Sequence, residues 1–127
     1  MRYLGLEEVI YIYTEIIHRT GGQAGIADEE LLQNILTKPL TSFEGEELYP
    51  DLFAKTAVLM YGMITGRPFI GGNDRAAAIC ALFLLRINGY HVAVTQDNLL
   101  DLIKGINDGR YKVDHLAAWF HRHAQPL

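Results

Sequence analysis

The sequence predicts an all-α fold of about six helices around a buried central helix. Apolar residues recur at intervals of three and four along several segments, which is the period of a helix with one buried face. The run from Ala76 to Leu85 is apolar on all sides, so the helix that contains it should be surrounded by the others. A length of 127 residues is typical of one domain, and we expect residues 1–127 to form it.

The first two helices are predicted from their apolar faces and their ends. A helix from Leu6 to Arg19 would bury Leu6, Val9, Ile10, Tyr13, Ile16 and Ile17. Asp28 is a suitable cap for a second helix, from Glu29 to about Leu36. The stretch from Thr37 to Pro50 contains two prolines and a glycine, which predicts a long loop, and loops of that length tend to be functional.

The remaining elements follow the same rules. With Asp51 as its cap, a third helix should run to Thr65. The central helix is expected from Asp74 to Asn88, and residues 90–94 could form a short extended segment. A fifth helix, capped by Thr95 or Asp97, should run toward Lys104, followed by a turn-rich connection over residues 105–110. The last helix is predicted from Val113 to His123.

Composition excludes several classes of protein. The net charge of −4 gives no electrostatic drive toward nucleic acid, so direct binding to DNA or RNA is not expected. The single cysteine cannot form an internal disulfide, and no signal peptide is evident, which together predict a cytoplasmic protein. The longest apolar run is ten residues, shorter than the roughly 18 that cross a bilayer, so no membrane span is expected.

The segment Arg67-Pro68-Phe69-Ile70-Gly71-Gly72-Asn73-Asp74-Arg75 is the main candidate for chemistry. Two adjacent glycines just before a buried helix present backbone N–H groups where the helix dipole favours an anion. Arg75 adds a guanidinium that can hold two phosphate oxygens. The alternative is an ordinary Gly-Gly turn with Asn73 as the helix cap. From these residues alone, both interpretations stay open.

This segment resembles the signature of the death-on-curing (Doc) toxins, a branch of the Fic-fold proteins. That signature reads His-Pro-Phe-x-Asp-Gly-Asn-Lys-Arg, and six of its nine positions, counting the free one, are compatible here. The resemblance spans nearly the whole chain. It includes Tyr3 to Glu8, Gly21-Gly22, Gly25-Ile26, Gly45 to Phe53 and Asn88-Gly89-Tyr90.

The resemblance implies a compact helical fold that binds ATP with Mg²⁺ at the loop before its central helix. Fic relatives transfer AMP to a hydroxyl of a target, whereas Doc toxins transfer a phosphoryl group, with elongation factor Tu as the described target. The family histidine takes the proton of the attacking hydroxyl, and the acidic residue and basic residues hold metal and phosphates. A partner antitoxin neutralises such toxins, through a disordered segment that folds as a helix into a groove.

The chain departs from the signature at three positions that carry those roles. Arg67 stands for the histidine, and its guanidinium has no lone pair with which to accept a proton. Gly71 stands for the acidic residue, so the loop lacks a carboxylate for a hard cation. Asp74 stands for the lysine and places a negative charge where a triphosphate would lie. The other motif residues that would bind nucleotide are retained, namely Gly72, Asn73 and Arg75.

Two functional hypotheses follow. In the first, the chain is a Doc-like protein of a toxin–antitoxin system with impaired catalysis, and it acts mainly as a binding module for an antitoxin-like segment or an active homologue. In the second, it still transfers a phosphoryl group or AMP from ATP to a hydroxyl of a translation factor such as elongation factor Tu, with Arg67 as an added phosphate clamp. ATP with Mg²⁺ should bind only weakly in either case.

Two further regions are candidates for function. Five histidines lie outside the motif, and His121 and His123 are two residues apart, on different faces of a helix, which argues against a shared metal.

The 37–50 loop mixes acidic and aromatic residues, and in the family the corresponding region lies near the mouth of the active-site cleft. It should therefore contact a target or partner, or else be a solvated loop that Phe43 and Tyr49 anchor.

Overall fold

The computed structural model describes residues Met1–Leu127, and the all-α prediction is confirmed. The six helices are α1 (Leu6–Thr20), α2 (Glu29–Thr37), α3 (Leu52–Gly66), α4 (Asn73–Ile87), α5 (Gln96–Asn107) and α6 (Val113–His123). A short 3₁₀ helix, η1 (Lys38–Leu40), follows α2. Two antiparallel strand pairs complete the fold, β1 (Ser42–Phe43) with β2 (Glu46–Glu47) and β3 (Tyr90–Val92) with β4 (Ala124–Pro126).

Three predicted caps begin the helices that they were expected to begin. The Asp28 carboxylate accepts from the Leu31 N–H at 3.0 Å, and the Asp51 carboxylate accepts from the Ala54 N–H at 2.8 Å. Of the two candidates for α5, Thr95 is the cap, because its hydroxyl accepts from the Asn98 N–H at 3.1 Å. Each side chain satisfies one of the N–H groups that a helix leaves unpaired at its start.

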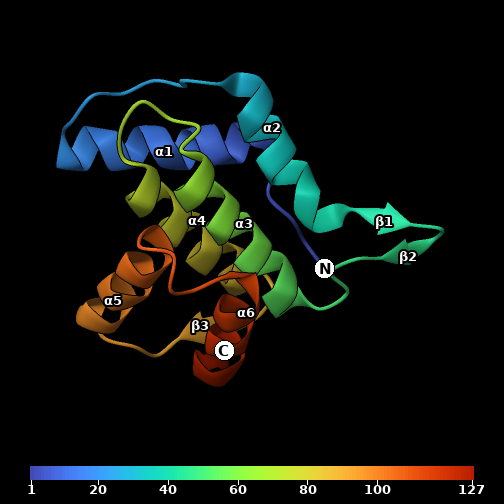
Figure 1. The fold of residues 1–127 in the computed structure, drawn as a ribbon. Helices are drawn as coiled ribbons and strands as arrows, with labels where there is room; N and C mark the ends of the chain where they lie inside the picture. The colour runs from blue at the N-terminus through green and yellow to red at the C-terminus, as the bar shows by residue number, and fades with distance from the viewer.

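The central position is shared by two helices, which corrects the expectation that α4 is enclosed on all sides. Figure 1 shows α3 and α4 in the middle of the molecule, with α1, α2, α5 and α6 around them. Residues 55–60 of α3 are buried in succession. On α4, by contrast, Ile79 and Phe83 are exposed, so one face of this apolar helix is open. The apolar run alone did not reveal this, because an open apolar face has the same sequence as a covered one.

The predicted loop from Thr37 to Pro50 is instead η1 followed by a small hairpin, which projects from the helices (Figure 1). Phe43 is 67% exposed, so it does not anchor this region. The anchor is Lys55 of α3, whose buried ammonium contacts the Glu47 carboxylate at 2.9 Å and donates to the Tyr49 carbonyl. A buried lysine requires such partners, because its charge loses water on folding.

The extended segment after α4 is confirmed over Tyr90–Val92, and its partner is the C-terminal strand. Tyr90 pairs with Pro126 and Val92 with Ala124. Within this pair, the end of the chain lies beside the end of α4. No pattern in the sequence predicted β4, because a three-residue strand is too short to show a recognisable alternation.

Helix α5 is longer than predicted, because it continues past Lys104 to Asn107. Gly105 was expected in a turn, but it is a buried helical residue against which the Tyr111 ring packs, where any side chain would collide with that ring. After α5, the exposed Asp108 carboxylate accepts from the Arg110 side chain at 2.9 Å, and this hydrogen bond lowers the pKa of Asp108. None of the helices combines the length and hydrophobicity needed to cross a membrane.

Candidate anion-binding site

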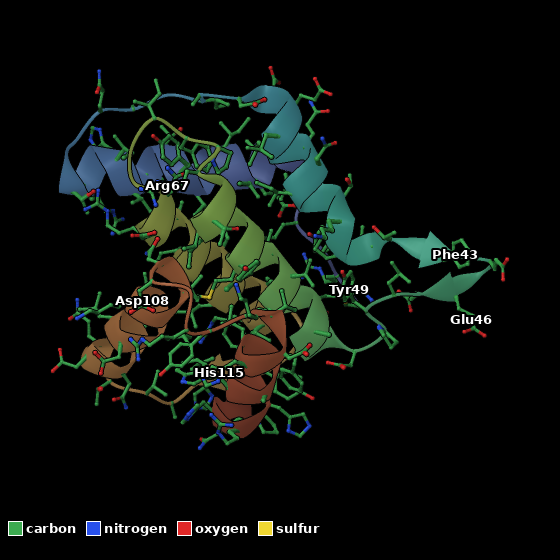
Figure 2. All side chains as sticks on the ribbon, in the orientation of Figure 1. Phe43, Glu46, Tyr49, Arg67, Asp108 and His115 are labelled. Carbon is green, nitrogen blue, oxygen red and sulfur yellow. The ribbon has the colours of Figure 1, made fainter.

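Residues 67–72 connect α3 to α4 and pack against the segment that precedes α2. Figure 2 shows Arg67 at the start of this connection. The Pro68 carbonyl accepts from the N–H groups of Ala27 at 2.8 Å and Asp28 at 3.1 Å, and the Ile70 N–H donates to the Gly25 carbonyl at 2.9 Å. These bonds fix the shape of the loop from outside.

Tyr13 of α1 holds the same two segments together. Its hydroxyl donates to the Gly71 carbonyl at 2.8 Å and accepts from the Gly25 N–H at 3.2 Å. Its ring stacks on that of Phe69, with centroids 3.8 Å apart. The sequence placed Tyr13 on a buried face but gave no sign of this role, because both partners lie far from it in the chain.

Asn73 is not the helix cap that the simpler interpretation required. Its amide oxygen accepts from the Phe69 N–H and its amide nitrogen donates to the Phe69 carbonyl, both at 2.9 Å. The cap position belongs to Gly72, whose φ of +78° is in the left-handed region that favours glycine. The Asn73 side chain therefore closes the loop by bonding to the backbone of Phe69, four residues earlier in the chain.

The start of α4 keeps the geometry of an anion site. The backbone N–H groups of residues 71–75 take part in no hydrogen bond within the chain. A Cβ atom at Gly22 or Gly72 would lie 4.0 Å or 3.8 Å from Arg75 Nη2, so the guanidinium of Arg75 lies over these glycines. Unpaired donors at a helix start, with an arginine beside them, suit a phosphate group.

The two substituted charges of the motif pair with each other. Arg67 Nη1 lies 3.4 Å from Asp74 Oδ1, and both side chains are partly exposed. The Asn107 side-chain amide, at the end of α5, donates to both carboxylate oxygens of Asp74 at 3.3 Å. Asn107 was not a candidate from sequence, because it lies 33 residues from Asp74. Asp74 is thus held on two sides.

Gly71, at the position that the resemblance assigns to an acidic residue, has no room for a side chain. A Cβ atom built there would lie 2.9 Å from the Gln23 carbonyl oxygen, closer than real Cβ atoms approach. This oxygen belongs to the backbone of the segment that Tyr13 and Pro68 hold in place. A carboxylate at position 71 therefore requires this segment to move.

An apolar groove lies on the open face of α4, between α1 and α5. Its main hollow, of about 470 Å³, includes three exposed apolar side chains, Tyr11, Ile79 and Leu100. Tyr11 and Ile12 also line an adjoining hollow of about 320 Å³ with Phe83, so the two hollows share a wall along α1. Its charged side chains differ between the two hollows, with Arg19, Arg75 and Glu15 in the first and Glu7 and Glu8 in the second.

The remaining candidates lie apart from the motif loop. Phe43 and Glu46 at the hairpin lie well away from Arg67 in Figure 2. Tyr49, however, lines a hollow of about 270 Å³ that reaches Thr65 and Gly66, next to Arg67. His121 packs edge to face on Phe53, at 5.2 Å between ring centroids. No group of three His, Cys, Asp or Glu side chains is placed to hold a metal ion.

Comparison with known proteins agrees with the motif. The family model described as "Fic/DOC family" matches residues 3–85. The chain is 32% identical over 117 residues to "Protein kinase doc" of Escherichia phage P1, an alignment that covers 92% of this chain and 91% of that protein. It is also 29% identical over 100 residues to "Toxin Doc" of Mycolicibacterium smegmatis, which covers 77% of each.

Proposed function

The chain belongs to the Fic/DOC family, and from this membership we propose that it is a toxin-family protein with impaired transferase chemistry that acts mainly by binding a partner. The observation that carries the proposal is the pairing of Arg67 with Asp74 at the two motif positions that the resemblance assigns to a base and a phosphate-binding lysine. The name of the phage P1 relative describes a kinase, and by the resemblance this chain lacks the base and the phosphate-binding lysine of the signature.

The loss of the base is supported by the chemistry of arginine. The Arg67 guanidinium stays protonated at any physiological pH, so it takes no proton from an attacking hydroxyl. Loss of a general base typically lowers the rate by about 10²–10⁴-fold. Asp74 adds a charge that repels phosphate, and its contacts with Arg67 and Asn107 keep that charge at the start of α4.

The loop fits a phosphate group better than it fits a metal. The free N–H groups of residues 71–75 and the Arg75 guanidinium are donors for phosphate oxygens. The loop offers no carboxylate at Gly71, and the Asp74 carboxylate already accepts from two side chains. We therefore propose that ATP with Mg²⁺ binds weakly, through its phosphates rather than through a well-formed metal site.

The proposed partner is an antitoxin-like segment that folds as an amphipathic helix in the groove between α1, α4 and α5. The groove presents Tyr11, Ile79 and Leu100 to solvent, and a helix with apolar residues every three or four positions would cover them. A segment that lies along the whole of α1, which has 15 residues and is therefore about 22 Å long, needs about four turns.

The charges of the groove predict which way the segment lies. In the first hollow Arg19 and Arg75 outnumber Glu15 and would attract acidic residues, and Glu7 and Glu8 in the second would attract basic residues. Occupation of the groove would also cover Arg75, which is part of the proposed phosphate site. Partner binding and phosphate binding should therefore oppose each other.

The catalytic half of the proposal is tested by transfer of label from ATP, carried at the γ or the α phosphate, to purified elongation factor Tu and to a bacterial lysate. We expect no transfer by the unmodified chain. Transfer would contradict impairment, and the position of the label would distinguish a kinase from a nucleotidyl transferase. To restore the signature, the double variant Arg67→His with Asp74→Lys is preferable to a variant that also changes Gly71. The double variant leaves Gly71 in place, where a side chain would collide with the Gln23 carbonyl.

The binding half is tested with the product of the small gene immediately upstream of the gene for this chain. We expect the two proteins to co-purify, and the substitution Ile79→Glu in the groove to weaken binding at least tenfold. Leu48→Glu is the matched control, because Leu48 is similarly exposed but lies outside the groove. Absence of such a gene, or equal effects of the two substitutions, would contradict a groove-bound antitoxin.

A further inference from the structure

A second cavity, of about 370 Å³, lies between α5 and α6 and includes no residue of the motif loop or of the groove. Asn98, Asp101 and Leu102 line it from α5. Tyr111 lines it from the connection between the two helices, and His115, Trp119, Arg122 and His123 line it from α6. Figure 2 shows His115 on α6, near the end of that connection.

Aromatic rings form much of the wall of this cavity. The rings of Tyr111 and His115 stack with centroids 3.9 Å apart and only 1° between their planes. The rings of Trp119 and His123 lie 4.6 Å apart. Trp119 is only 7% exposed, so its ring is held in place by packing and only a small part of it lines the cavity. A flat ring is the kind of group that packs well against such walls.

The two formal charges of the cavity are free. The three ion pairs of the chain are Lys55–Glu47, Arg67–Asp74 and Arg110–Asp108, so neither Asp101 nor Arg122 is engaged. Nor does either side chain form a hydrogen bond within the chain, although the nearby Asp108 and Arg110 do so. One cation and one anion therefore face the same cavity without a protein partner.

We propose that this cavity binds a small molecule that has a planar ring, an anionic group and a hydrogen-bond donor. The Arg122 guanidinium would hold the carboxylate or phosphate, where its forked N–H groups can donate two parallel bonds. Asp101 would accept from the donor, and the ring would lie against the aromatic wall. Aromatic amino acids and nucleoside monophosphates both have this chemistry.

A metal ion is the less suitable occupant. His115 and His123 are eight residues apart on one helix, which separates them by about 12 Å along its axis. Asp101 has no second carboxylate beside it in the cavity. The cavity thus combines recognition groups for an organic anion rather than a ligand set for a cation.

The test uses Trp119, which is the single tryptophan of the chain and lies in the cavity. The intact chain is titrated with L-phenylalanine and, separately, with AMP without metal, and Trp119 fluorescence and the heat of binding are both recorded. We expect saturable binding of at least one probe. A response to phenylalanine alone identifies an amino-acid site, and a response to AMP alone identifies a nucleotide site.

Variants connect the binding to the proposed residues. Arg122→Gln should weaken binding roughly tenfold or more, because it removes the charged donor. Arg86→Gln is the control, since Arg86 is an exposed arginine of α4 outside the cavity, and it should leave binding unchanged. The proposal is overturned if neither probe gives a fluorescence change or heat, or if Arg122→Gln binds as the unmodified chain does. Trp119 fluorescence and the effect of Arg122→Gln distinguish this cavity from the phosphate site proposed at the motif loop, so either result is independent of the function proposed above.

Discussion

At position 71 the backbone carbonyl of Gln23 occupies the space that a side chain would need. This residue therefore differs from Arg67 and Asp74, whose side chains are partly exposed and have space to change. The three departures from the family signature are not equivalent. Arg67 and Asp74 change the charge of partly exposed positions. Gly71, by contrast, is needed where the motif loop packs against the segment that contains Gln23.

Gly71→Asp should lower the free energy of unfolding by about 1–3 kcal/mol, because the segment that contains Gln23 must shift. Arg67→His and Asp74→Lys are the matched substitutions from the same motif, and each should change stability by less than about 1 kcal/mol. Chemical denaturation of the three single variants measures this difference. Equal changes in the free energy of unfolding for all three variants would show that position 71 accommodates a side chain.

Tyr13→Phe should also lower the free energy of unfolding by about 1–3 kcal/mol. The substitution removes the hydroxyl that joins the Gly25 N–H to the Gly71 carbonyl, and leaves both groups without this partner. Tyr11→Phe is the control, because Tyr11 lies two residues away on the same helix and is 68% exposed. Thermal melts of both variants measure this difference in stability. Identical melting temperatures would contradict the role assigned to the Tyr13 hydroxyl.

At the scale of elements, the β1–β2 hairpin is joined to α3 by the buried side chain of Lys55. It is a two-stranded unit with exposed residues in both strands, and such a pair has little stability of its own. Lys55 connects it to α3 through Glu47 and the Tyr49 carbonyl. The helix therefore holds the hairpin in place, rather than the hairpin's own strand pairing.

Lys55→Met should release the hairpin while α3 keeps its apolar packing. We expect a protease specific for glutamate to cleave at Glu44 and Glu46 roughly fivefold to tenfold faster than in the unmodified chain, since cleavage follows the population of the open segment. Lys104→Met, an exposed lysine on α5, serves as the reference. If both variants are cleaved at the rate of the unmodified chain, Lys55 does not hold the hairpin.

At the scale of the whole molecule, the core makes stability fall in alkaline solution. Burial raises the pKa of the Cys80 thiol from 9.0 to about 12. The pKa of Tyr3 is raised as well, first by burial and then by the neighbouring thiol. Between pH 9 and 12 the unfolded chain therefore binds fewer protons than the folded chain. The free energy of unfolding must fall as pH rises through this window.

The expected slope for one such group is up to about 1.4 kcal/mol per pH unit within that window. Urea denaturation at several pH values measures it, and Cys80→Ala should show a shallower dependence. Iodoacetamide should label Cys80 only as fast as the chain unfolds, because the thiol is fully buried. Rapid labelling of the folded protein, or an unchanged slope in Cys80→Ala, would contradict this description of the core.

Most helices could be predicted because their signals are local. Asp28, Asp51 and Thr95 each cap a helix by accepting from the N–H group three residues ahead, and an apolar face repeats within four residues. The errors lie where distant residues decide. Gly105 was predicted in a turn, but it lies in α5 with the Tyr111 ring packed against it. Residues 37–50 were predicted as a loop, but they contain η1 and a hairpin that Lys55 joins to α3.

The sequence by itself determined the helical fold class and the family, and it predicted three departures from the family signature, because each of these signals lies in neighbouring residues. Only the tertiary structure decided what those departures do. Asp74 meets Asn107 and Gly71 meets Gln23 across 33 and 48 residues of chain. The open face of α4 and the cavity between α5 and α6 were likewise invisible, since a sequence does not state which surfaces packing leaves uncovered.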